Sequence, residues 1–129
     1  MATRSEEVTL VVPASPEFVR LARLMAAGIA SRMGFTFDEV EDLRIAVDEL
    51  WYCLIGPHPE VGTVRLTCSI GADALEMEGV AAVEGEQRLH LSTVSEFSGR
   101  ILDAVVDEYT VEANGTRPSF RLIKRRATD

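Results

Sequence analysis

Glu49 and Cys53 are the two side chains whose types and spacing best suit chemistry. They lie four residues apart in the segment 35–55, so in a helix they share one face and can reach the same ligand. A carboxylate in such a place can serve as a general base, and the ordinary alternative is a polar side chain at a pocket rim or on the helix surface. Whether the pair lines a working site is the main functional question.

The other reactive side chains lack the neighbours that metal binding or nucleophilic catalysis requires. Cys53 and Cys68 have no C-x-x-C spacing, so we expect buried thiols and neither a metal site nor a disulfide. The two histidines fall in predicted loops without ligand partners. The serines of residues 92–98 lack the G-x-S-x-G context of an activated nucleophile.

Length and composition exclude several classes of function. The chain has 129 residues, 47% of them hydrophobic, and a formal net charge of −8, which fits one domain with a single core. Binding to nucleic acid needs clustered lysine and arginine, so we expect no nucleic-acid partner. No apolar run is long enough to span a membrane, and the N-terminus is polar. We therefore expect a soluble, cytoplasmic protein with no membrane partner.

Acidic side chains are concentrated in residues 36–55, where six of them accompany only Arg44. Such a surface could dock a basic protein partner. The alternative is a solvated helix face that keeps the protein soluble. The six acids are Asp38, Glu39, Glu41, Asp42, Asp48 and Glu49.

Two of the predicted helices lie in the first half of the chain. Ser15 and Pro16 are typical of a helix start, and Gly34 ends a helix whose expected buried stripe includes Leu21 and Met25. In the second helix, Thr36 and Glu39 have the spacing of a capping box. Apolar residues then recur at three- and four-residue steps, and Trp51 suits either the core or an interface.

The remaining segments predict one strand, two hairpins and a third helix. Alternating apolar residues indicate strands at 7–13, 64–70 and 75–83, while 84–92 loses the pattern. A capping box at Thr93 and Glu96 predicts a helix to about residue 108, with Phe97, Ile101, Ala104 and Val105 inside. Strands at 109–113 and 119–124 flank the turn at Asn114 and Gly115.

This order predicts an α+β fold, a two-layer α/β sandwich in which about three helices cover one face of a mostly antiparallel sheet. We expect a single domain over residues 1–129, with a flexible tail at 125–129.

The segment 31–50, SRMGFTFDEVEDLRIAVDEL, resembles the second-helix entry of the anti-sigma factor serine kinases, a bacterial group of the GHKL (histidine kinase-like) ATPase superfamily. The match is close over residues 8–50 and continues more weakly through the order of elements and the segment 103–112. That group controls stress-response and sporulation sigma factors. The resemblance implies the fold of the family.

The resemblance also identifies where a nucleotide site would lie. In the family, Glu-x-x-x-Asn supplies a base and a magnesium-holding amide; here Glu49 is kept but Cys53 replaces the Asn. The Asp-x-Gly-x-Gly box, which binds adenine, aligns with residues 81–85, where Ala81 replaces the Asp, Val83 replaces the first Gly and Gly85 is kept. The glycine-rich lid end aligns with residues 95–99, where only Gly99 is a glycine. Magnesium prefers oxygen ligands to a neutral thiol, so ATP binding should be lost.

We therefore expect an anti-sigma-factor-like regulator that binds proteins, with Glu49 a vestigial base and no cofactor. The resemblance implies a sigma factor or an anti-sigma antagonist as partner, and a homodimer. Two alternatives stay open. One is a divergent serine/threonine kinase that uses Mg-ATP, with Asp48 holding the metal, to phosphorylate an antagonist. The other is a small-molecule sensor that uses the vacated pocket.

Overall fold

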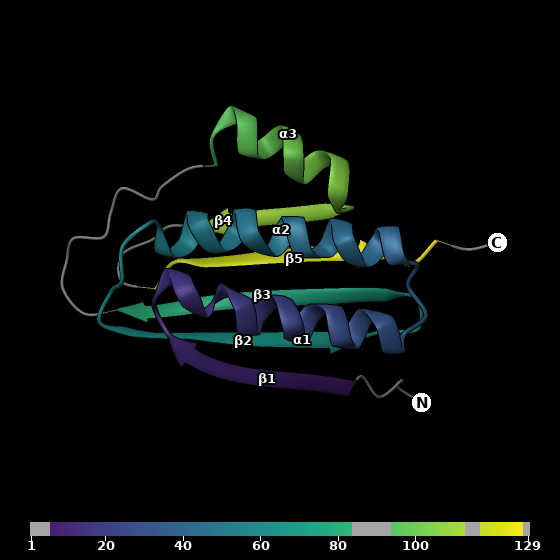
Figure 1. Cartoon of the computed structure of the whole chain (residues 1–129), viewed down its shortest axis with the longest axis horizontal. Coiled ribbons are helices and arrows are strands. Elements are labelled where there is room, and N and C mark those ends of the chain that lie inside the picture. Colours follow the sequence, from purple (N-terminus) through teal and green to yellow (C-terminus); the bar gives the residue numbers. More distant parts are fainter. Residues whose placement is uncertain (1–5, 84–93, 113–116, 128–129) are drawn as a thin grey trace.

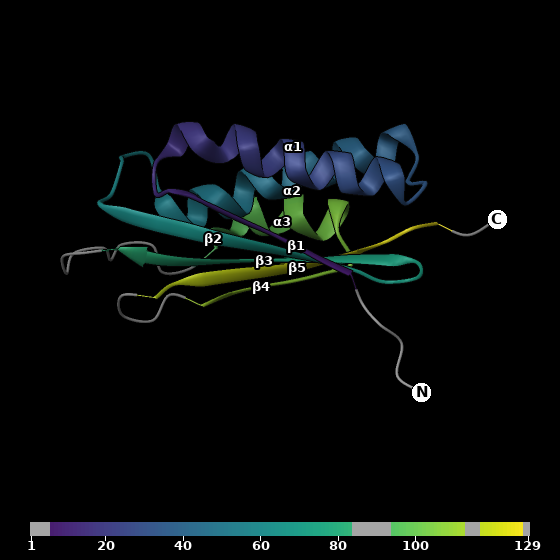
Figure 2. The ribbon, with the colours of Figure 1, turned by 90° about the horizontal axis from the view of Figure 1, so that it is seen from below.

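The computed structural model describes residues 6–83, 94–112 and 117–127, which form a sheet covered by helices on one face (Figures 1 and 2). The strands are ordered β1-β2-β3-β5-β4, and each neighbouring pair is antiparallel. The predicted α+β sandwich is thus confirmed. In chain order the described elements are β1 (Glu6–Pro13), a 3-10 turn (Pro16–Phe18), α1 (Val19–Arg32), α2 (Phe37–Ile55), β2 (Gly62–Ile70), β3 (Ala74–Val83), α3 (Glu96–Val105), β4 (Glu108–Glu112) and β5 (Ser119–Arg125).

The core lies between the sheet and the helices. Alternate residues of the central strands face the helices, as the period of two predicts, and the fully buried side chains of β2 and β3 include Leu66, Leu75 and Met77. From the helix side, Leu43, Val47 and other apolar residues of α2 meet them. Helix α2 is therefore the central helix of the layer, with α1 and α3 on either side of it (Figure 1).

Helix α2 begins and ends as the sequence predicts. The Thr36 hydroxyl accepts a hydrogen bond from the Glu39 backbone N–H at 3.1 Å, and the Glu39 carboxylate accepts one from the Thr36 N–H at 2.8 Å. Gly56, with φ of 78°, follows the last turn in a conformation that favours glycine. Trp51 belongs to the core, and its ring N–H donates to the Ser15 carbonyl at 3.3 Å.

Helix α1 differs from its prediction at its start and on its buried face. Ser15 occupies the cap position of the 3-10 turn, but its side chain makes no capping hydrogen bond. The fully buried residues of α1 are Ala22, Ala26 and Ala30, whereas Leu21 is 40% exposed. Small side chains allow the close approach of two helices. Met25, also expected in the buried stripe, is partly buried against the core.

Helix α3 is shorter than predicted and turned differently. Its cap is Ser95, whose hydroxyl accepts from the Ser98 N–H at 3.0 Å, and Thr93 lies outside the described residues. The helix ends at Val105, and β4 already begins at Glu108. Leu102 is fully buried, while Phe97, which we expected inside, is 74% exposed. Ala104, also expected inside, is exposed as well. Val105, expected inside, is buried, and Ile101 is partly buried against the core.

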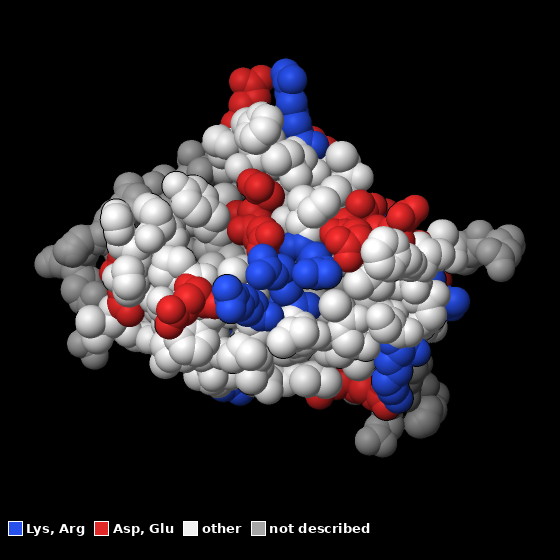
Figure 3. Space-filling view, viewed as in Figure 1, with Lys and Arg blue, Asp and Glu red and all other residues white. Residues whose placement is uncertain are grey.

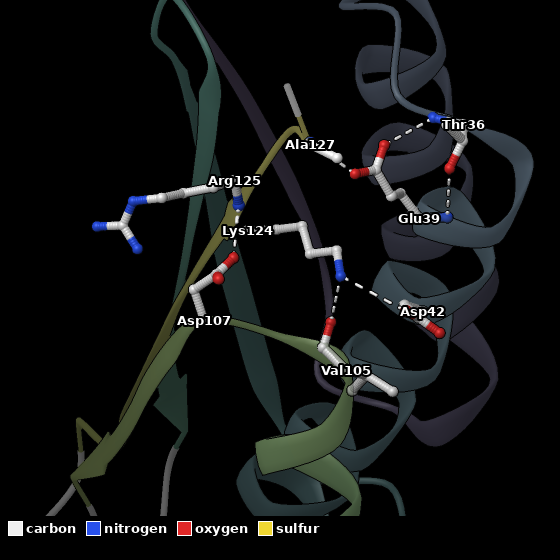
Figure 4. A network of polar contacts seen from close by, with 8 residues as sticks. All are labelled: Thr36, Glu39, Asp42, Val105, Asp107, Lys124, Arg125 and Ala127. Atoms are coloured by element: carbon white, nitrogen blue, oxygen red, sulfur yellow. Dashed lines mark hydrogen bonds and ion pairs between the residues drawn. The ribbon is translucent and has the colours of Figure 1, made fainter. Parts of the chain in front are cut away.

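A polar network ties the end of β5 to α2 (Figure 4). The buried Lys124 ammonium donates to the Val105 carbonyl at 2.8 Å and pairs with Asp42 at 3.5 Å. The Glu39 carboxylate accepts from the Ala127 N–H at 2.7 Å. These hydrogen bonds lower the pKa of Glu39, the one from Thr36 most strongly. Residues 125–127, assigned to a flexible tail from the sequence, thus make backbone hydrogen bonds, and residues 128–129 lie outside the described part.

Among the described residues, no helix combines the length and the apolar character needed to cross a membrane.

Candidate functional site

Glu49 and Cys53 lie on the side of α2 that faces α3. The Glu49 carboxylate accepts a hydrogen bond from the Ser98 hydroxyl at 2.7 Å, and both side chains are partly buried. Cys53 is half-buried one turn further along. The negative charge of Glu49 acts on Cys53, as the four-residue spacing predicts, so the two side chains share one environment.

Burial makes the Cys53 thiol a weak acid. Desolvation raises its pKa above the ordinary value, and the charge of Glu49 raises it further. Cys68, buried in β2, has its pKa raised by burial to about 12. Both cysteines are thiols at neutral pH, unsuited to nucleophilic attack or to magnesium. No group of three or more possible metal ligands occurs within the described ranges.

The segment that aligns with the lid end of the family forms the first turn of α3. Ser98 reaches Glu49 from this turn. At Gly99, a Cβ atom would lie 3.4 Å from the Tyr109 hydroxyl oxygen, which shows how closely β4 approaches the turn. Desolvation raises the pKa of Tyr109, and the negative charge of Asp103 adds to the effect. Ser98 and Tyr109 therefore complete the environment of Glu49 and Cys53.

Sequence reasoning did not identify Ser98 or Tyr109 as members of this site. Ser98 is 49 residues from its partner Glu49, and no local pattern predicts which helix face receives it. The one available signal was the spacing of Ser95 and Ser98, which suits a helix cap and its first turn.

Ala81 and Val83, which the family resemblance aligns with the adenine box, belong to the packed core. Both lie on the helix-facing side of β3; Ala81 is fully buried and Val83 is 8% exposed. The Ala81 N–H donates to the Pro118 carbonyl at 2.9 Å. Gly85 lies outside the described residues. An alkyl side chain at position 81 offers no acceptor for a nucleotide base.

Three of the acidic side chains of α2 pair with cationic side chains. Asp48 accepts a hydrogen bond from Arg23 of α1 at 2.7 Å, on the outer face rather than beside Glu49. Glu41 pairs with Arg44, and Asp42 pairs with Lys124. Five of the six acids make polar contacts, including Glu39 at the cap and Glu49 with Ser98. The docking and solvated-face interpretations of this acidic surface both stay predictions.

The outer face of the helix layer carries a basic hollow between α1 and α2. Its volume is about 320 Å³. Figure 3 shows basic side chains gathered at the centre of this face, with acidic groups at their borders. Arg20 makes no ion pair within the described ranges, and the apolar Leu24 is 67% exposed. The lining residues are Arg20, Arg23, Leu24, Ala27 and Arg44.

The chain is similar to a class of bacterial serine kinases. Serine-protein kinase RsbW of Listeria monocytogenes serotype 4a is 55% identical over 49 residues, which are 38% of this chain and 31% of that relative. For RsbW of Bacillus subtilis the identity is 51% with the same coverage. RsbW of Bacillus cereus is 34% identical over 79 residues, 60% of this chain and 49% of the relative. No family model matches the chain.

These similarities confirm the predicted resemblance to the anti-sigma factor serine kinases, with RsbW as the named relative. The matched region spans less than half the length of each of these relatives.

Proposed function

We propose that this chain is an anti-sigma-factor-like regulator that acts by binding another protein and has lost ATP binding and kinase activity. The burial of Ala81 in the packed core carries this proposal. Recognition of adenine by a carboxylate at this position has been replaced by apolar packing. The RsbW similarity supports the regulatory role, and the altered side chains support the loss of nucleotide chemistry.

The residues present do not fit magnesium. A hard cation of this kind binds oxygen ligands in near-octahedral geometry. Cys53 offers a buried thiol with a raised pKa, and the Glu49 carboxylate is engaged by the Ser98 hydroxyl at 2.7 Å. Asp48, the alternative metal ligand, is paired with Arg23 on another side of α2. This donor set supplies no magnesium site for phosphoryl transfer.

The basic hollow is the surface that we propose for the partner. Arg23 and Arg44 pair with acids of α2, so their charge is partly balanced, whereas Arg20 makes no ion pair within the described ranges. The exposed Leu24 and the partly buried Ala27 add apolar area beside the guanidinium groups. This combination suits an acidic segment with an apolar anchor, carried by a sigma factor or an anti-sigma antagonist.

Reversing the charge of the hollow should weaken partner binding. We expect Arg20→Glu to reduce the affinity for a sigma factor or antagonist encoded with this chain by about tenfold, because a repulsive charge then faces the acidic segment. Calorimetric titration of the partner measures the effect. Arg65→Glu is the matched control, since Arg65 is an exposed arginine of β2, pointing away from the helix layer. Equal affinities of the two variants would refute the docking surface.

Two observations favour the kinase alternative: the relatives are named serine-protein kinases, and Glu49 is retained. It requires Mg-ATP to bind, so nucleotide titration separates it from the proposed function. The sensor alternative has less support. It requires a pocket at the vacated nucleotide site, but Ala81 and Val83 are packed in the core. The two hollows described are lined by other residues: the basic hollow lies on the outer face, and the second, lined by Asp103, Tyr109 and their neighbours, lies at the corner of α3 and β4.

We further propose that the protein is a cytoplasmic homodimer, on the strength of the family resemblance alone. Light scattering of the purified protein tests the oligomeric state.

A further inference from the structure

The two ends of α3 are held in different ways. At its C-terminal end, Leu102 is fully buried and Val105 is 8% exposed, and the Val105 carbonyl accepts from the Lys124 ammonium. At its N-terminal end, Phe97 is 74% exposed, and the ion pair between Glu96 and Arg100 stays within the helix. Burial therefore anchors the C-terminal half much more strongly.

One polar contact joins the N-terminal turn of α3 to α2 in the described part of the chain. Ser98 donates its hydroxyl hydrogen to the Glu49 carboxylate, while its backbone N–H is bound by the Ser95 cap. A hydrogen bond to an ionised group in a partly buried place is stronger than an ordinary one. The contact thus supplies specific attachment where apolar packing is sparse.

We propose that Ser98 and Glu49 form a latch that holds the N-terminal turn of α3 against α2, one helical turn from Cys53, and that this turn swings away about the Leu102 end when the latch breaks. Glu49 is then a structural acceptor in the closed state, and its carboxylate and the neighbouring thiol, both partly buried there, become more accessible in the open state. The latch operates whether or not the chain binds nucleotide.

Cys53 reports directly on this opening. It is half-buried beside Glu49, whereas Cys68 is fully buried in β2 and serves as an internal control. Ser98→Ala removes the hydroxyl donor and keeps the Glu49 charge, so the electrostatic effect on the thiol is unchanged. We expect iodoacetamide to alkylate Cys53 about tenfold faster in this variant, from loss of a hydrogen bond to a charged group.

Ser69→Ala is the matched control, because Ser69 also donates to a glutamate, Glu7, at 3.4 Å on the sheet. Mass spectrometry assigns the alkylation rate to each cysteine. We expect Ser98→Thr, which keeps a hydroxyl, to restore the slow rate, and Cys68 to stay unreactive throughout. Equal Cys53 rates in Ser98→Ala and Ser69→Ala would overturn the proposal. So would parallel acceleration of Cys53 and Cys68, which indicates global unfolding instead of a local opening.

Discussion

Replacing Ala81 with aspartate is expected to lower the free energy of unfolding by about 3 to 5 kcal/mol, the cost of an uncompensated buried charge. Ala81 is fully buried on the helix-facing side of β3, and its own N–H is already bonded to the Pro118 carbonyl. A carboxylate there must either stay ionised without a partner or take up a proton. Both outcomes are costly, so restoring the adenine-binding residue should damage the fold before it restores binding.

Urea unfolding of the variant at neutral pH measures this cost. Ala82→Asp is the matched control, since Ala82 is the next residue of β3 and its side chain is exposed on the opposite face of the sheet. The control should change the free energy of unfolding by less than about 1 kcal/mol. If Ala81→Asp were as stable as Ala82→Asp, position 81 would have access to water, and an open nucleotide pocket would be the better description.

Gly62→Ala is the second substitution with a large expected effect, a loss of about 3 kcal/mol or more. Gly62 has φ of +143°, which side-chain-bearing residues rarely adopt. An added Cβ would also meet the Ala82 carbonyl oxygen, at 2.1 Å, and the Val83 Cα atom, at 2.7 Å. Both are backbone atoms of the neighbouring strand, so the contact can be relieved only by moving β2 away from β3.

Thermal and urea unfolding test this prediction against Gly28→Ala in α1. A Cβ at Gly28 meets nothing within 4 Å, and alanine is the better helix former, so this variant should gain up to about 1 kcal/mol. The same glycine-to-alanine change should therefore lower the free energy of unfolding at position 62 and raise it at position 28. Equal stability of Gly62→Ala and the native chain would show that the end of β3 is not held against β2 as described.

Most of the fold could be predicted from local signals. The capping box of Thr36 and Glu39, the apolar stripe of α2 and the alternation in β2 and β3 are each set by neighbouring residues. Helix α3 was misplaced because Thr93 and Ser95 both suit a cap position. Leu102 faces inward and Phe97 outward because of how α3 packs on α2, which no single-helix pattern fixes.

The site was predictable only where its residues are close in sequence. The shared face of Glu49 and Cys53 follows from helical spacing, but the contact from Ser98 depends on how α3 packs. The ion pairs on the acidic exterior of α2 could not be predicted for the same reason. Arg23 and Lys124, which balance Asp48 and Asp42, come from a neighbouring helix and from the last strand. Tertiary pairing, rather than composition, decides which charges remain available.

Calorimetric titration of Mg-ATP into the purified chain tests the central claim most directly. The Trp51 ring lies buried in the C-terminal half of α2, where it contacts the Ser15 carbonyl. Its fluorescence gives a second reading on the same samples. RsbW of Bacillus subtilis, a serine-protein kinase, is the positive control. A chain that has given up nucleotide chemistry should show no saturable heat at millimolar Mg-ATP, while the control binds. Saturable binding with a micromolar dissociation constant would contradict this account and favour the divergent kinase.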